Sequence, residues 1–154
     1  MDGILIIDKP AGITSHDVVS RVRRILKTKK VGHTGTLDPF ATGVMVVVVG
    51  KATRLAQFLD KDEKEYRAVM KLGFETDTGD GTGRPRIAER ARQSEEVAEV
   101  LATADPAKIL DGYRGEIEQV PPMFSAKKVE GKKLYELARR GEEVERRAVT
   151  VTIS

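Results

Sequence analysis

The sequence contains no cysteine and no tryptophan, only two histidines, and aromatic residues make up 5% of its 154 positions. Without cysteine the protein forms no disulfide and has no thiolate nucleophile, and two histidines are too few for the usual kind of zinc site. No apolar run approaches the about 20 residues that a membrane-spanning helix needs. The N-terminus also lacks the basic start and long apolar core of a signal peptide. These absences predict a cytoplasmic protein without a metal centre.

An excess of charge of one sign is also missing. The chain carries 27 Lys and Arg against 24 Asp and Glu, and a net charge of +3 is too small to indicate a nucleic-acid partner. Six of the seven basic residues in the first 50 positions lie between Arg21 and Lys30, a pattern typical of a solvated helix face. With 40% hydrophobic and 33% charged residues, the composition predicts one globular domain over residues 1–154.

Hydrophobic periodicity predicts a strand, a helix and a second strand in the first 50 residues. The apolar run 3–7 indicates a buried strand, and the run 44–49, in which five of six residues are valine, indicates a central strand covered on both faces. Between them, Ser15 is a candidate N-cap for an amphipathic helix. The apolar positions of this helix are Val18, Val22, Ile25 and Leu26.

Further along, the pattern predicts shorter elements. Alternation over residues 65–73 indicates a strand with Tyr66 facing inward, and residues 75–85 form a flexible acidic loop. The remaining expected elements are a short helix after Gly50, a helix capped by Ser94, a turn at residues 106–110, a strand in 114–128 broken by two prolines, a helix over 133–140 stopped by Gly141, and a strand over 149–154.

The loop GHTGTLDPFATG, residues 32–43, joins the predicted helix to the central strand. It lacks the glycine and lysine order of a phosphate-binding P-loop, and His33 has no evident third partner for a nucleophilic triad. The acidic loop lacks the glutamate that closes a calcium site. On local evidence, Asp38 before Pro39 is a turn or cap residue. These patterns alone leave the function open.

Longer runs carry more information than any of these motifs. In chain order they are ILIIDKPAGITSHDVV, GHTGTLDPFATGVMVVVVGKATR, KEYRAVMKLGFETDTGDGTG and RGEIEQVPPMFSAKKVEGKKLYELARRGEEVERR. Together they resemble the bacterial TruB family of tRNA pseudouridine synthases over nearly the whole chain. The resemblance implies an α+β pseudouridine synthase fold, with a mixed, mostly antiparallel sheet flanked by helices.

The resemblance also implies that the chain is the N-terminal part of a catalytic domain. In the family this domain continues, beyond the position of Ser154, into a segment with an arginine that pairs with the catalytic aspartate and a further tyrosine. A small C-terminal RNA-binding domain usually follows. The alternating pattern of residues 149–154, with nothing after it to cover it, leads to the same expectation.

The implied activity is isomerisation of uridine 55 in the T loop of tRNA. The enzyme breaks the N1 glycosidic bond, rotates the base and rejoins it through C5, without a cofactor or metal. The implied partner is the T arm of tRNA, and the implied state is a monomer that needs no protein partner.

Five residues match functional positions of the family. Asp38 matches the catalytic aspartate; whether it attacks the sugar or only assists glycosidic cleavage stays open. Tyr66 matches the tyrosine that stacks on the flipped base, although its local pattern favours core packing. His33 matches the histidine that helps to displace the target base. Lys9 and Arg54 match basic positions that support the site or contact phosphate.

An alternative of a different class is a non-catalytic RNA-binding or tRNA chaperone fragment of the same family. The arginine and tyrosine that the family supplies further along, and the basic residues between 21 and 30, motivate this hypothesis. It predicts salt-sensitive tRNA binding without any product, whereas the enzyme hypothesis predicts pseudouridine that depends on Asp38.

Overall fold

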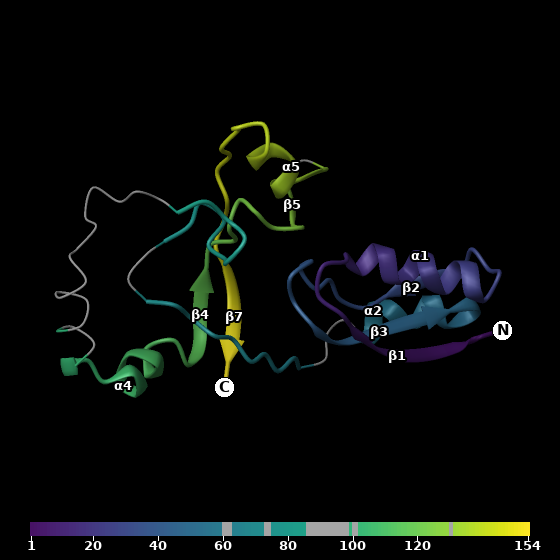
Figure 1. Ribbon diagram of the computed structural model, residues 1–154, viewed down its shortest axis with the longest axis horizontal. Helices are drawn as coiled ribbons and strands as arrows, with labels where there is room; N and C mark the ends of the chain where they lie inside the picture. Colours follow the sequence, from purple (N-terminus) through teal and green to yellow (C-terminus); the bar gives the residue numbers. More distant parts are fainter. Residues whose placement is uncertain (60–62, 73–74, 86–98, 100–101, 130) are drawn as a thin grey trace. The chain divides into compact units, whose positions relative to one another are not determined.

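The computed structural model describes residues 1–59, 63–72, 75–85, 99, 102–129 and 131–154. The chain forms two compact units, Met1–Ala68 and Val69–Ser154 (Figure 1). Helices and strands occur in both units, and every strand pair between described residues is antiparallel, which confirms the α+β class. Within the same ranges, no helix has the length and apolar character needed to cross a membrane.

The first unit is built on a three-stranded sheet with the strand order β1–β3–β2. The strands are β1 (Gly3–Lys9), β2 (Val31–His33) and β3 (Gly43–Val49). Because β3 pairs with a strand on each side, the predicted central strand is confirmed. Its burial is uneven, since residues 47–49 are fully enclosed while Val44 is 70% exposed.

β1 is an edge strand, and the expectation that residues 3–7 are buried is wrong. Among the residues that the structure describes, the strand pairs only with β3, and Ile4 and Ile6 are 46% and 67% exposed. Successive side chains of a strand point to opposite faces, and Leu5, on the face opposite to Ile4 and Ile6, is also 39% exposed. Ile7 lies on the other face and packs against the core.

Helix α1 (Ser15–Ile25) supplies the other half of the core. The predicted helix is confirmed, and Val18 and Val22 are buried as expected. Ile25, the last helical residue, is 75% exposed, whereas Val19 is buried, so the expected apolar face is wrong at these two positions. The buried cluster consists of Val18, Val19, Val22, Val31, Met45, Val47 and Val49.

Thr14 caps α1, which corrects the prediction that Ser15 does so. The Thr14 hydroxyl accepts a hydrogen bond from the Asp17 amide at 3.0 Å, and the Asp17 carboxylate accepts one from the Thr14 amide at 2.8 Å. This reciprocal pair is a capping box, which satisfies donors that a helix start otherwise leaves unpaired. The hydroxyl and amide of Thr14 also lower the pKa of Asp17. The Ser15 side chain is therefore left for another partner.

The predicted helix after β3 is present as η1 (Gly50–Leu55) followed by α2 (Ala56–Leu59). Gly50 has a positive φ of 64°, and a Cβ at this position would collide with the Asp2 side chain and the Met1 carbonyl. The Asp2 carboxylate accepts a hydrogen bond from the Lys51 amide at 2.7 Å. The start of η1 is thus tied to the N-terminus, and only glycine fits the turn.

The strand predicted over residues 65–73 is not formed by the described residues 63–72, which have no regular secondary structure. Tyr66 is 69% exposed, so the expectation that it faces inward is wrong. Alternation makes a segment suitable for a strand, but a strand also needs a neighbour that accepts and donates its backbone hydrogen bonds. Among the described residues, no strand pairs with this segment.

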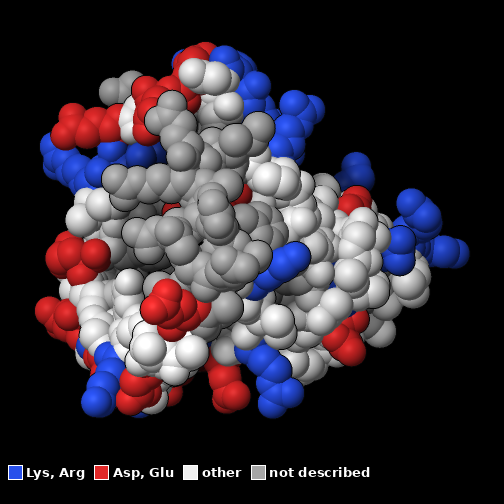
Figure 2. Space-filling view, turned by 60° about the vertical axis from the view of Figure 1, so that its left-hand side comes forward, with Lys and Arg blue, Asp and Glu red and all other residues white. Residues whose placement is uncertain are grey.

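The second unit contains short helices and two small strand pairs. Its elements are α4 (Pro106–Asp111), β4 (Gly115–Gln119), β5 (Lys128–Val129), β6 (Lys132–Lys133), α5 (Leu134–Ala138) and β7 (Val149–Ile153). β4 pairs with β7 and β5 with β6. Lys and Arg side chains as well as Asp and Glu side chains reach the surface in the view of Figure 2.

Several predictions for this unit are confirmed. β4 ends before the two prolines at 121 and 122, and Gly141, with a φ of 73°, follows α5. The turn expected at residues 106–110 is instead a short helix, because Asp105 caps it by accepting a hydrogen bond from the Ala107 amide at 3.1 Å. The helix predicted from Ser94 lies outside the described residues.

Candidate active site

The loop from residue 34 to residue 42 joins β2 to β3 and carries Asp38. The Asp38 side chain is exposed, and its carboxylate has no hydrogen bond or ion pair with any other described residue. Its backbone carbonyl accepts a hydrogen bond from the Ala41 amide at 3.1 Å, which closes a tight turn. The carboxylate is therefore open to a molecule that approaches from solvent.

The residues on either side of Asp38 are held by Gly12, in the segment between β1 and α1, and by Ser15, the first residue of α1. On one side, the buried Ser15 hydroxyl accepts a hydrogen bond from the Leu37 amide at 2.9 Å and donates one to the Leu37 carbonyl at 3.1 Å. On the other side, the Gly12 amide donates to the Pro39 carbonyl at 2.7 Å. The Asp38 side chain thus has no partner among the described residues, whereas the backbone of the residue on each side of it is restrained.

Lys9 is completely buried directly beneath this loop. Its ammonium donates hydrogen bonds to the carbonyls of Ile13 at 2.8 Å, Pro10 at 3.1 Å and Pro39 at 3.3 Å. A buried charge is tolerated only when polar partners replace its water, and three carbonyls match the three protons of an ammonium group. In this arrangement Lys9 has no proton left for a phosphate, which favours the support role.

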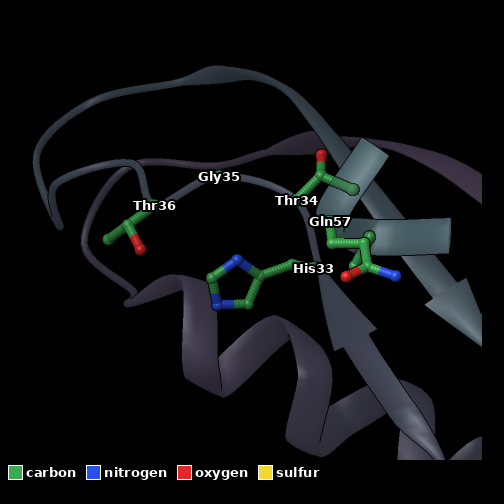
Figure 3. Close-up of a pocket in the computed structure, with 6 residues that line it drawn as sticks. His33, Thr34, Gly35, Thr36 and Gln57 are labelled. Carbon is green, nitrogen blue, oxygen red and sulfur yellow. The ribbon is translucent and has the colours of Figure 1, made fainter. Parts of the chain in front are cut away.

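His33 ends β2 and lines an open hollow of about 340 Å³ (Figure 3). Its ring is half-buried, and the buried Nδ1 atom has no hydrogen-bond partner among the described residues. In the view of Figure 3 the imidazole lies between the side chains of Thr36 and Gln57. The hollow is lined by His33, Thr34, Gly35, Thr36, Ala56 and Gln57. An imidazole and two short polar side chains can hydrogen-bond a planar heterocycle placed there.

Arg54 lies in the last turn of η1, and its side chain is exposed. The Gln57 side chain, one of the groups around the hollow, donates to the Arg54 carbonyl at 3.4 Å. Arg54 and Gln57, which lines the hollow, therefore lie on the continuous helical segment formed by η1 and α2. An exposed guanidinium in this place is suited to a phosphate oxygen.

Tyr66 lies on the irregular segment that follows α2. Two residues before it, the Lys64 side chain approaches the loop, because a Cβ built on Gly35 would lie 3.9 Å from Lys64 Cε. The segment therefore passes beside the glycine-rich part of the loop. The exposed Tyr66 ring has no ring or hydrogen-bond contact with another described residue, Asp38 included.

The structure brings Lys9 and the Asp38 loop into direct contact and places His33 at the start of the same loop. Arg54 adjoins the His33 hollow, and Tyr66 is not brought into contact with these residues. Sequence reasoning missed Ser15, Gly12 and Gln57 as parts of the site. For Ser15 the reason is that a hydroxyl near a helix start is more often a cap. Within the described ranges, no group of three His, Cys, Asp or Glu residues could hold a metal ion.

A family model matches residues 23–154, and its description is the N-terminal domain of the TruB family pseudouridylate synthases. The chain belongs to the TruB family. The match includes the loop with Asp38, the hollow beside His33, the first unit from Arg23 onward and the whole of the second unit.

Curated members of the TruB family named tRNA pseudouridine synthase B align with almost the whole chain. The Geotalea uraniireducens protein is 53% identical over 153 residues, which cover 99% of this chain and 47% of that relative. The Bacillus anthracis protein is 49% identical over 156 residues, which cover 99% of this chain and 48% of that relative. The chain therefore spans about half the length of the curated relatives it matches.

A solved structure agrees with the fold. The crystal structure of a Cbf5–Nop10–Gar1 complex contains a chain that is 27% identical to this TruB family member, with a TM-score of 0.51. The similarity covers 97% of this chain and 33% of the matched chain. The arrangement of strands and helices described above is thus one that another solved protein also adopts.

Proposed function

We propose that this chain carries the catalytic site of a tRNA pseudouridine synthase that converts uridine 55 in the T loop of tRNA to pseudouridine. The single observation that carries the proposal is the exposed, unpartnered carboxylate of Asp38 on a loop whose flanking residues are tethered. A carboxylate held in this way is available to a substrate, whereas one bonded to its own loop is not. The names of the relatives support the substrate class.

The reaction that we assign to Asp38 takes place at C1′ of the target ribose. The bond from C1′ to N1 breaks, the uracil turns, and a bond from C1′ to C5 forms, while C5 loses a proton and N1 gains one. Asp38 acts at C1′ as an ionised carboxylate, either by attack on the carbon or by stabilisation of positive charge on the sugar. Both routes need the open side-chain position that Asp38 has.

A base that is stacked in a folded loop must first leave the stack, at a cost of a few kcal/mol. We assign two residues to this step. The Tyr66 ring, 69% exposed, stacks on the extruded base, an interaction worth about 1 to 3 kcal/mol. His33 occupies the space that the base leaves, next to its hollow.

The two basic residues take different roles in this proposal. Arg54 is exposed and contacts a phosphate of the T arm. Lys9 is buried and supports the loop through the Pro39 carbonyl. The proposed substrate is tRNA, the proposed location is the cytoplasm, and the chain acts as a monomer without a protein partner or cofactor.

The test is chemical tagging of pseudouridine in a T-arm RNA hairpin after incubation with the unsubstituted chain and with Asp38→Asn. We expect product from the former and at least a 1,000-fold slower rate from the latter, on the order of the loss seen when a catalytic carboxylate is removed. Asp111→Asn is the matched control, because this exposed carboxylate pairs, among the described residues, with Arg114 of the second unit alone.

Equal product from Asp38→Asn would contradict the catalytic assignment. If neither protein forms product but both bind the hairpin with an affinity that falls steeply with salt, the enzyme proposal fails and the non-catalytic RNA-binding hypothesis takes its place.

A further inference from the structure

We propose that Ser15 is a positioning residue for the reaction, because its hydroxyl holds the backbone N–H and carbonyl of Leu37, the residue before Asp38. This inference rests on the proposed function and extends it to a residue that does not touch the substrate. Ser15 is 2% exposed and lies at the first position of α1. It reaches Leu37, which is 22 residues away along the chain.

The geometry of the clamp is specific for a hydroxyl group. One Oγ atom accepts the Leu37 N–H at 2.9 Å and donates to the Leu37 carbonyl at 3.1 Å. A hydroxyl provides one donor and two acceptor sites, so both bonds can exist at the same time. The two bonds hold both polar atoms of one residue, which limits rotation of the backbone directly before Asp38.

Helix capping does not account for the Ser15 side chain. Thr14 and Asp17 already cap α1 through two reciprocal hydrogen bonds. The Ser15 hydroxyl is buried, and a buried hydroxyl without a partner destabilises the fold, so its partners determine its role. Both hydrogen bonds of Ser15 go to the loop, and none goes to its own helix.

On the far side of Asp38, the backbone is restrained independently. The Pro39 carbonyl accepts hydrogen bonds from the Gly12 amide at 2.7 Å and from Lys9 Nζ at 3.3 Å. The proline ring also biases Asp38 towards an extended backbone. With both neighbours held, the backbone of Asp38 has less freedom to move the carboxylate. Removal of the Ser15 clamp frees one of the two sides.

A small displacement of a reacting group has a large kinetic effect. A shift of about 1 Å can lower a rate about 100-fold, even when the substituted residue is remote from the reacting atoms. We therefore expect Ser15→Ala to slow the reaction at saturating RNA and to leave RNA affinity almost unchanged. A residue with a purely structural role would lower thermal stability without this separation of rate from binding.

The experiment compares Ser15→Ala, Ser15→Thr and Ser20→Ala with the unsubstituted chain. Ser15→Thr keeps the hydroxyl, and Ser20→Ala removes a half-buried hydroxyl from the same helix that makes no bond to the loop. Three quantities are measured: the single-turnover rate of pseudouridine formation in a T-arm hairpin, the Kd for that hairpin, and hydrogen exchange of the Leu37 amide by NMR.

For Ser15→Ala we expect a rate about 10- to 100-fold lower, a Kd within about twofold, and Leu37 exchange at least about tenfold faster. Ser15→Thr restores the rate to within about threefold, and Ser20→Ala changes none of the three quantities. Exchange at Leu37 confirms that the clamp exists in solution, whether or not a variant is less stable overall.

Three outcomes would overturn the inference. The first is an unchanged rate for Ser15→Ala, and the second is unchanged exchange at Leu37. The third is a loss of rate matched by an equal loss of RNA affinity. No product from the unsubstituted chain would contradict the proposed function and remove the catalytic part of this inference with it. Product from the unsubstituted chain and from Ser15→Ala at equal rates would defeat the Ser15 role alone.

Discussion

Two loops of this protein place an aspartate among glycines and threonines, and they use it in opposite ways. In the turn of residues 75–85, Asp80 accepts hydrogen bonds from the Thr78 hydroxyl at 2.8 Å, the Thr82 amide at 2.8 Å and the Thr82 hydroxyl at 2.6 Å. These donors, the Thr82 hydroxyl first, lower the pKa of Asp80. One oxygen of the carboxylate, Oδ1, thus accepts all three hydrogen bonds from its own loop.

Asp38 has the reverse arrangement. Its carboxylate is unpartnered among the described residues, and the backbone around it is held by Ser15, Gly12 and Lys9, all from another part of the chain. A loop that is supported from outside does not need its own aspartate for support. The two loops have similar compositions. They differ in whether the hydrogen bonds that hold the loop come from its own aspartate or from another part of the chain, and only the second arrangement leaves the carboxylate available to a substrate.

The largest expected effect separates the two carboxylates by activity. Asp80→Asn should leave pseudouridine formation within about threefold of the unsubstituted chain and lower the stability by about 1 kcal/mol, because it weakens hydrogen bonds to a charged acceptor. Asp38→Asn should lose pseudouridine formation and leave the stability almost unchanged. Tagging of pseudouridine and urea unfolding measure the two effects. Loss of product in Asp80→Asn, with the stability kept, would end the contrast between the loops.

The next effect concerns the support beneath Asp38. Lys9→Met should lower the free energy of unfolding by about 1 to 3 kcal/mol, since the carbonyls of Ile13 and Pro39 lose the buried ammonium that donates to them. Product formation should slow as well, because Pro39 is released. Lys30→Met removes an exposed lysine and serves as the control. Equal urea midpoints for the two variants would show that the buried ammonium is not a support.

The smallest effect is a pH dependence that belongs to the Asp80 turn. Because the folded pKa of Asp80 is below its usual value of 3.8, its carboxylate stabilises the fold above that value, and this stabilisation is lost as the pH falls through the lower folded pKa. Thr82→Val removes the hydroxyl that contributes most, so it should reduce the loss of thermal stability between neutral and acid pH. The measurement is the Tm of the unsubstituted protein and of Thr82→Val at neutral and at acid pH. An equal loss of Tm in the two proteins would contradict this assignment.

Two elements of the first unit could be predicted from the sequence with their positions in the chain. β3 and α1 have strong periodic patterns, and both were found where expected. The predictions failed where packing decides the outcome. Ile25 has the spacing of a core residue but is exposed, and the alternating segment around Tyr66 has no strand partner among the described residues. Periodicity indicates which face of a helix or strand can be buried, but burial also needs another element that packs against that face.

For the site, the resemblance named Asp38, His33, Lys9, Arg54 and Tyr66, and their roles stay predictions. The local pattern had described Asp38 as a turn residue, and its carbonyl does close a turn through Ala41. Ser15 was predicted as a helix cap, because a serine followed by a helix is compatible with that role. Its true partner, Leu37, is too far along the chain for any local rule to find.

By itself, the sequence determined the local elements: a valine-rich strand, an amphipathic helix started by threonine and aspartate, and a glycine-rich loop with an aspartate before proline. These follow from side-chain shape and from hydrogen bonds between residues a few positions apart. Only the tertiary structure decided that Ser15, Gly12 and Lys9 hold the loop while the carboxylate of Asp38 stays free. The reason is that these tethers join residues brought together by the pairing of β1 with β3 and the packing of α1 on the sheet, and such contacts exist only once the chain has folded.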